Sequence, residues 1–339
     1  MKLSDFDYEL PKELIAQEPA EPRDSSRLMV LRDGIELRIF RDIVDYLDAG
    51  DVMVMNDTKV LKARIFGKKS TGGSIEALIL RRIEGNLWEA LLKGKTKPGM
   101  VLDFSGHKAK IIEKEEGKAL IEFSEDPRMI MEEQGIYPLP PYIKEYRGDL
   151  ERYQTVYAKK EGAIAAPTAG LHFTPELLKE IKKKGVEMVH ITLHVGWGTF
   201  KPVKVENIEE HRMEAEWYEI SKEAAERINS REGRLFAVGT TTVRALESSS
   251  MDGAVIPGAK ETELFIYPGY EFKSGMDALI TNFHLPKSTL LMLVTAFGGY
   301  ERVMSAYKLA VKERFRFFSF GDAMLIFKKF KYKNRMLDR

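Results

Sequence analysis

Apolar residues in this chain gather in short runs separated by polar turns, and the clearest such pattern lies between residues 163 and 200. Residues 174–176 read Thr-Pro-Glu and predict a helix start, because a hydroxyl, a proline and a carboxylate each favour the first turn of a helix. The helix is predicted to end at residues 182–185, Lys-Lys-Lys-Gly, where cations and glycine favour termination. Residues 186–195 are rich in β-branched side chains and predict a strand. Strand, glycine-containing loop, helix and strand form the pattern of a βαβ crossover.

The same alternation returns in the C-terminal half of the chain. We predict a helix over residues 221–229, a buried strand over 235–239, and a helix start with three hydroxyls over 240–242. A second strand, from residue 278, leads into a capped helix over 290–297. Polar ligands bind at the carboxyl edge of such sheets, and free N–H groups at a helix start suit an anion. The alternative for residues 240–242 is simple threonine capping.

Residues 64–146 have a different texture. Short β-rich runs recur at a spacing of about ten residues and are separated by turns such as Glu-Gly-Asn at 84–86, which predicts a small barrel or sandwich. Helical patterns dominate on both sides of this region. The predicted fold class is therefore α/β, with a larger, barrel-like α/β domain over residues 1–63 and 147–339 and an inserted small all-β barrel domain over 64–146.

Composition narrows the class of protein. The 339 residues include no cysteine, which excludes disulfides, thiolate metal sites and cysteine nucleophiles. No apolar run approaches the ~20 residues that span a bilayer, and the first residues lack the apolar core of a secretory signal. We therefore expect a cytoplasmic protein with no membrane partner. The formal net charge is +1, so a nucleic-acid surface would have to be local.

Three of the six histidines, His172, His190 and His194, lie in the first pattern described. His172 falls in a loop between apolar segments, and His194 falls at a strand end, where enzymes keep working groups. Asp57 follows an apolar strand over residues 51–55 and is a third candidate, although Asp is also common in plain turns. His190 and His194 would be ~13 Å apart on a strand, so we predict no metal site. We read His190 as a structural residue.

Two common nucleotide motifs fail here. Residues 94–96 read Gly-Lys-Thr, but Glu89 occupies the position where a phosphate loop needs its first glycine. Residues 196–198 read Gly-Trp-Gly, but Lys201 occupies the position of the third glycine of a dinucleotide fingerprint. The chemistry must therefore be sought in longer motifs.

Several long motifs, in one order, resemble a known family. They are Tyr-Gln-Thr-Val-Tyr-Ala at 153–158, Ala-Pro-Thr-Ala-Gly-Leu-His-Phe at 166–173, His-Val-Gly-Trp-Gly-Thr-Phe at 194–200 and Thr-Asn-Phe-His-Leu-Pro-Lys-Ser-Thr at 281–289. They closely resemble the S-adenosylmethionine:tRNA ribosyltransferase-isomerase family of queuosine biosynthesis. The resemblance extends from residues 5–11, through 56–59, to 317–324, and it is weakest in the β-rich insert.

The chain departs from the family pattern at two places. Trp197 stands where an aliphatic residue is usual between two glycines, and Glu214 and Ala215 replace a His-Ser pair. A catalytic role for that missing histidine is therefore in doubt for this chain.

The resemblance implies a specific reaction. The family transfers and isomerises the ribosyl unit of S-adenosylmethionine onto the aminomethyl group of a deazaguanine at the wobble position of tRNA, which yields epoxyqueuosine in tRNA and releases adenine and methionine. S-adenosylmethionine is thus a consumed cosubstrate, and no true cofactor is implied. The expected partner is tRNA that carries the deazaguanine-type wobble base, with no obligate protein partner. The sulfonium acidifies the neighbouring ribose carbon, so a general base is expected to remove that proton before adenine leaves.

The resemblance also suggests roles for particular residues. His172 or His194 is the expected base, with Asp57 near the sulfonium or acting as acid partner. We expect S-adenosylmethionine to contact Thr168, Gly170, Gly196, Trp197, Gly198, Thr240, Thr241, Arg244 and Ser288. We expect the RNA to contact Lys59, Arg64, Lys182, Lys183, Lys184, Lys287 and Arg314. Trp197 could instead pack at the domain junction. The basic run at 328–333, with its interleaved aromatics, could bind RNA or be a solvated tail.

Two other classes of function remain open from the residues. A small-molecule lyase or isomerase would use the β-rich insert as a lid, and it would bind free nucleoside but not tRNA. A non-catalytic RNA-binding module would not need histidines and hydroxyls clustered at strand ends, and it would fail to bind S-adenosylmethionine.

Overall fold

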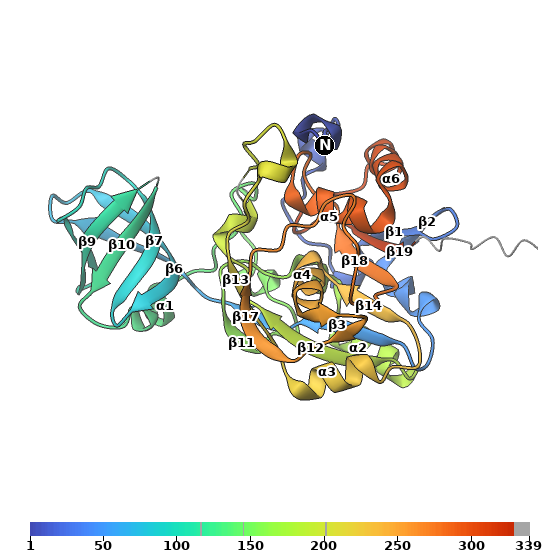
Figure 1. Ribbon diagram of the computed structural model, residues 1–339. Coiled ribbons are helices and arrows are strands. Elements are labelled where there is room, and N and C mark those ends of the chain that lie inside the picture. Colours follow the sequence, from blue (N-terminus) through green and yellow to red (C-terminus); the bar gives the residue numbers. More distant parts are fainter. Residues whose placement is uncertain (116, 145, 201, 329–339) are drawn as a thin grey trace, which may run out of the picture.

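The computed structural model describes residues 1–115, 117–144, 146–200 and 202–328, which form a large α/β body with a small barrel beside it (Figure 1). The α/β body is built on one nine-stranded sheet. Its strands, in spatial order, are β17 (Gly258–Thr262), β13 (Glu216–Ile220), β12 (Glu187–Leu193), β3 (Val52–Asn56), β14 (Leu235–Val238), β18 (Ala278–Asn282), β19 (Ala323–Phe327), β1 (Arg27–Leu31) and β2 (Ile35–Ile39). Neighbours among β12, β3, β14 and β18 are parallel, so their carboxyl ends meet at one edge.

Helices cover both faces of this sheet. Every residue of β3, β14, β18 and β19 is buried, as expected for central strands covered on both sides. One face packs against α3 (Lys222–Asn229), α4 (Thr240–Ser249), α5 (Thr289–Gly298) and α6 (Tyr300–Lys312). The other packs against α2 (Pro175–Lys183) and the 3-10 helix η4 (Phe40–Tyr46). We call these the α4 face and the α2 face.

The barrel closes in the order β10-β7-β6-β5-β8-β9. Its strands are β5 (Arg64–Lys69), β6 (Ser74–Glu84), β7 (Leu87–Lys93), β8 (Val101–Phe104), β9 (His107–Glu115) and β10 (Lys118–Phe123), and α1 (Pro127–Gln134) follows. The inserted all-β barrel is therefore confirmed. The run that forms β5 was not among the predicted strands, because Arg64–Lys69 is broken by a glycine and two lysines. The boundaries 64–146 as those of an independent domain stay a prediction.

The larger body is α/β, as predicted, but its sheet is open and has two edge strands. β17 and β2 occupy opposite ends of the strand order, so the described strands form an open sheet and not the barrel-like closure expected for this body. Four of the five residues of β2 are exposed, which is typical of an edge strand that nothing covers. The α/β class is thus confirmed, and the barrel-like shape belongs to the insert.

The predicted βαβ crossover is partly correct. Helix α2 and strand β12 form as predicted, and Thr174 caps the helix by accepting a hydrogen bond from the Leu177 amide at 3.1 Å. The strand before them, β11 (Lys160–Ala163), pairs instead with β4 (Thr58–Val60) in a separate two-stranded sheet. The crossover therefore links two sheets, because β11 pairs with β4 and β12 pairs with β3 of the large sheet.

The remaining elements are short. They are β15 (Ser250–Met251), β16 (Ala254–Val255) and the 3-10 helices η1 (Leu3–Phe6), η2 (Lys12–Leu14), η3 (Arg23–Ser25), η5 (Leu150–Tyr153), η6 (Thr168–His172), η7 (Trp197–Phe200) and η8 (Ile208–Glu210). Within the described ranges, no helix has the length and apolar character needed to cross a membrane.

Candidate functional site

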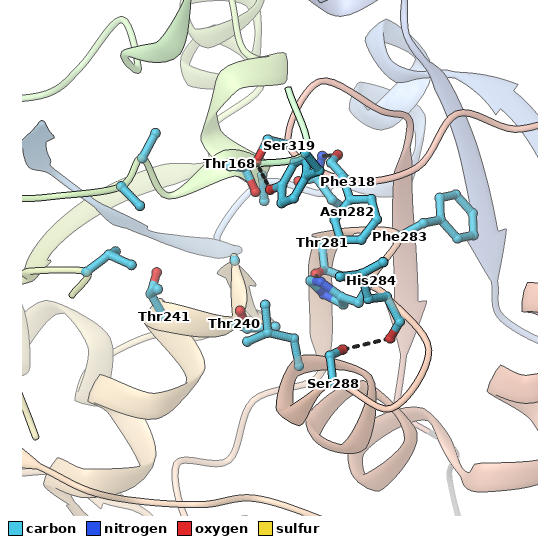
Figure 2. Close-up of a pocket in the computed structure, with 18 of the residues that line it drawn as sticks. Thr168, Thr240, Thr241, Thr281, Asn282, Phe283, His284, Ser288, Phe318 and Ser319 are labelled. Atoms are coloured by element: carbon cyan, nitrogen blue, oxygen red, sulfur yellow. Dashed lines mark hydrogen bonds between the residues drawn. The ribbon is translucent and has the colours of Figure 1, made fainter. Parts of the chain in front are cut away.

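A cavity of about 620 Å³ lies at the carboxyl ends of β14 and β18 (Figure 2). Residues 239–241, which follow β14, and residues 281–285, at the end of β18, line it. Residues 165–169, Tyr142 and Phe318 also line it. The cavity therefore lies at the sheet edge where the sequence predicted a polar ligand.

The start of helix α4 faces this cavity. Its N-cap is Gly239, whose φ of +89° is in the left-handed region that glycine tolerates. A glycine has no side chain that could cap the first turn, and the amide of Val243 is the one that bonds back to the Gly239 carbonyl, at 3.2 Å. Thr240 and Thr241 line the cavity. The positive end of this helix, with its first N–H groups, can therefore hold a carboxylate or a phosphate.

The start of helix α5 borders the cavity differently. Ser288 lines the cavity, but its hydroxyl donates to the Leu285 carbonyl at 2.8 Å and accepts from the Leu291 amide at 3.2 Å (Figure 2). Its hydroxyl is thus engaged in capping. Lys287 also lines the cavity and pairs with Asp7 at 2.7 Å. Thr168, in η6, completes the predicted residues at this cavity.

An aromatic pair also lines the cavity. Tyr142 and Phe318 are stacked, with ring centroids 4.4 Å apart and an interplanar angle of 29°. Phe318 has a φ of +73°, a conformation that costs a residue other than glycine about 1–3 kcal/mol. Its amide donates to the Phe283 carbonyl at 3.0 Å, and its carbonyl accepts from the Asn282 side chain at 3.0 Å. The surrounding bonds therefore hold a strained residue in the cavity wall.

His284 is the histidine that lines the cavity. Its Nε2 lies 2.8 Å from the Thr281 hydroxyl. Burial lowers the pKa of His284 to about 3, so the ring is neutral at pH 7. A neutral imidazole at a ligand cavity can accept a proton or a hydrogen bond.

His172 lines a separate and much smaller hollow. Its Nδ1 lies 2.7 Å from the Ser26 hydroxyl and its Nε2 lies 3.2 Å from the Asn282 amide nitrogen. Because that nitrogen is a donor, Nε2 must be the acceptor and Nδ1 carries the proton. Burial, followed by the charges of Arg316, Arg23 and Arg152, lowers the pKa of His172 to about 3. The ring is therefore neutral and is tied, through Asn282, to the cavity wall.

Asp57 and His194 belong to a packed cluster on the α2 face. Side chains alternate between the faces of a sheet, so His194 points away from the apolar α4 face that Val195 joins. Asp57 accepts a hydrogen bond from the Thr192 hydroxyl at 2.7 Å, and His194 Nδ1 lies 2.7 Å from the Thr58 hydroxyl. Burial is the main cause that lowers the pKa of His194. Across the described ranges, no group of three or more His, Asp or Glu is placed to hold a metal ion.

Other predicted ligand residues have structural partners. A Cβ on Gly170 would lie 2.0 Å from the Tyr157 hydroxyl, so packing requires glycine there. The Gly196 amide donates to Glu216 at 2.8 Å. Arg244 forms a buried ion pair with the same carboxylate.

The next two predicted residues lie toward the barrel. A Cβ on Gly198 would lie 2.6 Å from a carboxylate oxygen of Glu214. Trp197 packs against the barrel core, which is the junction role that the sequence left open for it. The structure therefore brings Thr168, Thr240, Thr241, Ser288 and Lys287 together at the cavity and gives the glycines at 196 and 198, Trp197 and Arg244 positions elsewhere.

The predicted RNA contacts are spread widely. Lys59 pairs with Glu161 at 2.9 Å, and Arg64 pairs with Glu76 at 3.4 Å. Arg314 follows helix α6. Residues 182–184 end α2 and lead into the amino end of β12, so these lysines lie at the edge of the sheet opposite the cavity. Of the basic run at 328–333, residues 329–333 lie outside the described residues.

The cavity residues that the sequence did not predict include Tyr142, Asn282, His284 and Phe318. Asn282 ends an apolar strand and His284 follows it, as Asp57 follows β3, so both could have been chosen by the same rule. Tyr142 lies in a proline-containing segment that the sequence assigned to the insert. The left-handed backbone conformation of Phe318 cannot be predicted from a pattern of apolar positions.

Comparison with known proteins gives one consistent result. The family described as queuosine biosynthesis protein matches residues 3–326. A protein of Desulforamulus reducens described as S-adenosylmethionine:tRNA ribosyltransferase-isomerase is 56% identical over 341 residues, which cover 96% of this chain and 100% of the relative. A protein of Thermotoga maritima with the same description is 54% identical over the same coverage.

A solved structure agrees with these relatives. The crystal structure of S-adenosylmethionine tRNA ribosyltransferase from Thermotoga maritima matches 95% of this chain and 100% of its own, with a TM-score of 0.56 and 43% identity in that alignment. Similarity of this extent leaves little of the chain outside the match. The chain therefore belongs to the queuosine biosynthesis protein family.

Proposed function

We propose that this protein transfers and isomerises the ribosyl unit of S-adenosylmethionine onto the aminomethyl-deazaguanine wobble base of tRNA, with release of adenine and methionine. Membership of the family and the descriptions of relatives that are 54% and 56% identical support this activity. The observation that carries it is the 620 Å³ cavity, which is lined by a helix start and an aromatic pair. That volume is within the range usual for small-molecule sites, about 300–1,000 Å³.

The cavity offers a complementary surface to each end of S-adenosylmethionine. We assign the methionine carboxylate to the first turn of α4, beside Thr240 and Thr241, because a helix start favours negative charge. We assign the adenine ring to the Tyr142 and Phe318 side, since flat aromatic surfaces favour stacking. The ribose would then lie between them.

The wobble base must enter the same cavity, because its amine attacks the ribosyl unit. A base inside a stacked loop reaches such a site by leaving its stack. Lys144 and Lys287 line the cavity and provide positive charge for the RNA. A tRNA substrate also implies a cytoplasmic location.

Proton transfer needs a group that touches the ligand. His284 is neutral and lines the cavity, so we assign it the proton that is lost from the ribose carbon next to the sulfonium. Its low pKa makes it a weak base, and the acidity that the sulfonium gives this carbon compensates. A positioned base contributes about 10²–10⁴-fold to a rate.

We assign His172 a positioning role. It holds Asn282, and Asn282 holds the carbonyl of the strained Phe318. Loss of the imidazole would therefore release the aromatic wall without removing a proton acceptor from the cavity. His194 remains the alternative base that the family resemblance suggested, with Asp57 near the sulfonium or acting as acid partner.

Release of adenine tests the proposal directly. The protein is incubated with S-adenosylmethionine, with and without tRNA that carries the aminomethyl-deazaguanine base, and adenine, methionine and the mass of the RNA are measured. We expect release of adenine and methionine that depends on this RNA, with a matching gain of mass. Release of adenine without RNA, or no release from folded protein that binds S-adenosylmethionine, would contradict the proposal.

A further inference from the structure

Three arginines from distant parts of the chain converge behind the cavity wall. Arg23 lies in η3 and Arg152 lies in η5, and both line the small hollow that His172 also lines. Arg316 precedes β19 and reaches the carbonyl of Glu18 beside the hollow at 3.4 Å. Residues 168–172 separate this hollow from the cavity. Ser319 lines both spaces, so they adjoin at this residue.

The positive charges in the hollow are incompletely balanced. Arg23 Nη1 donates to the Leu171 carbonyl at 3.2 Å, and Arg152 Nη2 donates to the Ala20 carbonyl at 2.6 Å. Carbonyls satisfy these donors but do not cancel their charge. Burial and then the charge of Arg152 lower the pKa of Arg23 to about 10, which is consistent with two cations held near each other.

The nearby carboxylates do not fill the hollow. Glu21 lies 3.2 Å from Arg152 Nε, but its side chain is 78% exposed. Asp149 caps η5 through the Glu151 amide. Asp322 is buried and accepts from the amides of Arg27 and Arg316 at 3.0 and 2.8 Å. Asp322 also lies 3.4 Å from Arg316 Nη2, so it balances the charge of Arg316. Glu21 and Asp149 lie outside the lining of the hollow, and the cations that line it are Arg23 and Arg152.

We propose that this hollow binds a phosphate group, and that the group is a backbone phosphate of the RNA whose wobble base enters the cavity. Guanidinium groups bind phosphate through paired hydrogen bonds. The hollow has a volume of about 10 Å³, which corresponds to roughly one water-sized atom. It can seat one oxygen of a phosphate that otherwise stays at the surface, as a backbone phosphate would. The choice of RNA as the source rests on the proposed function.

The position of the hollow next to the cavity suits a phosphate that holds the nucleotide in place. A base that leaves its stack must be held by its backbone while it occupies the cavity. The hollow and the cavity share Ser319, whose hydroxyl lies 2.7 Å from that of Tyr142 in the aromatic wall. A phosphate bound at the arginines would therefore anchor the nucleotide on one side of the wall while its base lies on the other side.

Charge-removing substitutions test the site in the full-length protein. Arg23→Gln and Arg152→Gln are compared with Arg227→Gln, a control with the same charge change in α3, where Arg227 pairs with Glu187 at the amino end of β12. The affinity for tRNA is measured across a series of NaCl concentrations, without S-adenosylmethionine. Removal of one ion pair between the protein and an RNA phosphate should reduce the slope of log K against log salt by about 0.7–0.9. We expect about tenfold weaker binding for the two variants and an unchanged slope for the control.

Several outcomes would overturn the proposal. Equal slopes for wild type, Arg23→Gln and Arg152→Gln would do so, as would an equally weakened affinity in the control. Circular dichroism checks folding, and Arg152→Lys supplies a second test, because it keeps the charge and should keep the slope while it loses the paired hydrogen bonds and some affinity. Binding is measured without turnover, so a protein that shows the predicted slopes but no adenine release would lose the proposed function and keep the RNA-binding phosphate site.

A second measurement separates RNA phosphate from free phosphate. Inorganic phosphate is titrated into the protein while the ring signals of His172 are followed by nuclear magnetic resonance. An anion at the arginines should raise the pKa of His172, and Arg23→Gln should reduce that rise. We expect inorganic phosphate to act weakly and to compete with tRNA. Tight binding of inorganic phosphate that leaves tRNA affinity unchanged would reassign the hollow to a free anion and overturn the RNA assignment.

Discussion

The two faces of the sheet use polar side chains differently at the same carboxyl edge. On the α4 face, Thr240 and His284 line an open cavity. On the α2 face, Asp57 and His194 bond to neighbouring hydroxyls at 2.7 Å. The residue types are similar and the strands are neighbours. Polar residues at strand ends therefore predict which edge of the sheet holds polar groups. They do not show whether those side chains face a ligand or one another.

The largest effect should separate His284 from His194. We expect His284→Gln to lower kcat/KM for RNA-dependent adenine release by at least about 10²-fold, because it removes the proton acceptor from the cavity. His194→Gln should change kcat/KM by less than about tenfold, and it should lower the melting temperature because the Thr58 hydroxyl loses its partner. Steady-state kinetics and thermal unfolding of both variants measure the two effects.

The reverse result would place the catalytic base on the α2 face and not on the α4 face. If His194→Gln abolished turnover in a folded protein while His284→Gln retained it, the base would lie in the packed cluster. Asp57 would then be its natural partner. A ligand would have to open that cluster in order to reach the base.

The sequence predicted well where helices start at the carboxyl edge of the sheet. It predicted less well which face of the sheet each polar side chain occupies. The start of α2 was predicted from Thr174, and helices were predicted over 221–229 and 290–297. In the structure Thr174, Ser221 and Ser288 cap α2, α3 and α5, and each accepts a hydrogen bond from an amide three residues later. These signals are local, so a single sequence contains them. The rule that chose Asp57 could equally have chosen His284, because both follow buried strands.

The side chains behind the cavity could not be predicted in the same way. Arg23, Arg152 and Arg316 are separated by more than a hundred residues along the chain, and only the fold brings them together around His172. No pattern of apolar and polar positions encodes such a meeting. The same holds for Tyr142 and Phe318, whose stacking depends on a left-handed backbone conformation.

The buried histidines His172 and His284 should make the protein less stable to unfolding as the pH falls. The pKa values of His172 and His284 are lowered from 6.5 to about 3 in the folded protein, so the unfolded chain binds protons first as the pH falls. Their stabilising contribution is complete above about pH 6.5 and is lost progressively toward pH 3. Each histidine should cost about 1.4 kcal/mol of unfolding free energy for each pH unit in that window.

Urea unfolding between pH 7 and pH 4.5 measures this change in stability. His172→Gln has no proton to bind, so its unfolding free energy should fall less steeply with decreasing pH than that of the wild type. His211→Gln is the comparison, because His211 is half-buried against the ring of Phe265 and burial lowers its pKa less than that of His172. Its substitution should flatten the curve in the same direction but by less. Parallel curves for His172→Gln and the wild type would show that His172 is not the buried neutral group described.

The smallest effect should come from a histidine in a third environment, at the surface of the barrel. His107 lies 2.5 Å from Glu125 and 3.2 Å from Glu133, and these hydrogen bonds raise its pKa, with Glu125 the larger cause. Its folded pKa is above the ordinary value, so its contribution is complete below about pH 6.5 and is lost as the pH rises through the folded pKa. The change in stability with pH is therefore opposite in sign to that of His172.

Because water and salt screen an exposed pair, we expect hydrogen exchange of the barrel amides to be only slightly faster in His107→Gln, at pH 5.5 and not at pH 8.5. An equal change at both pH values would show that His107 acts by packing and not by charge.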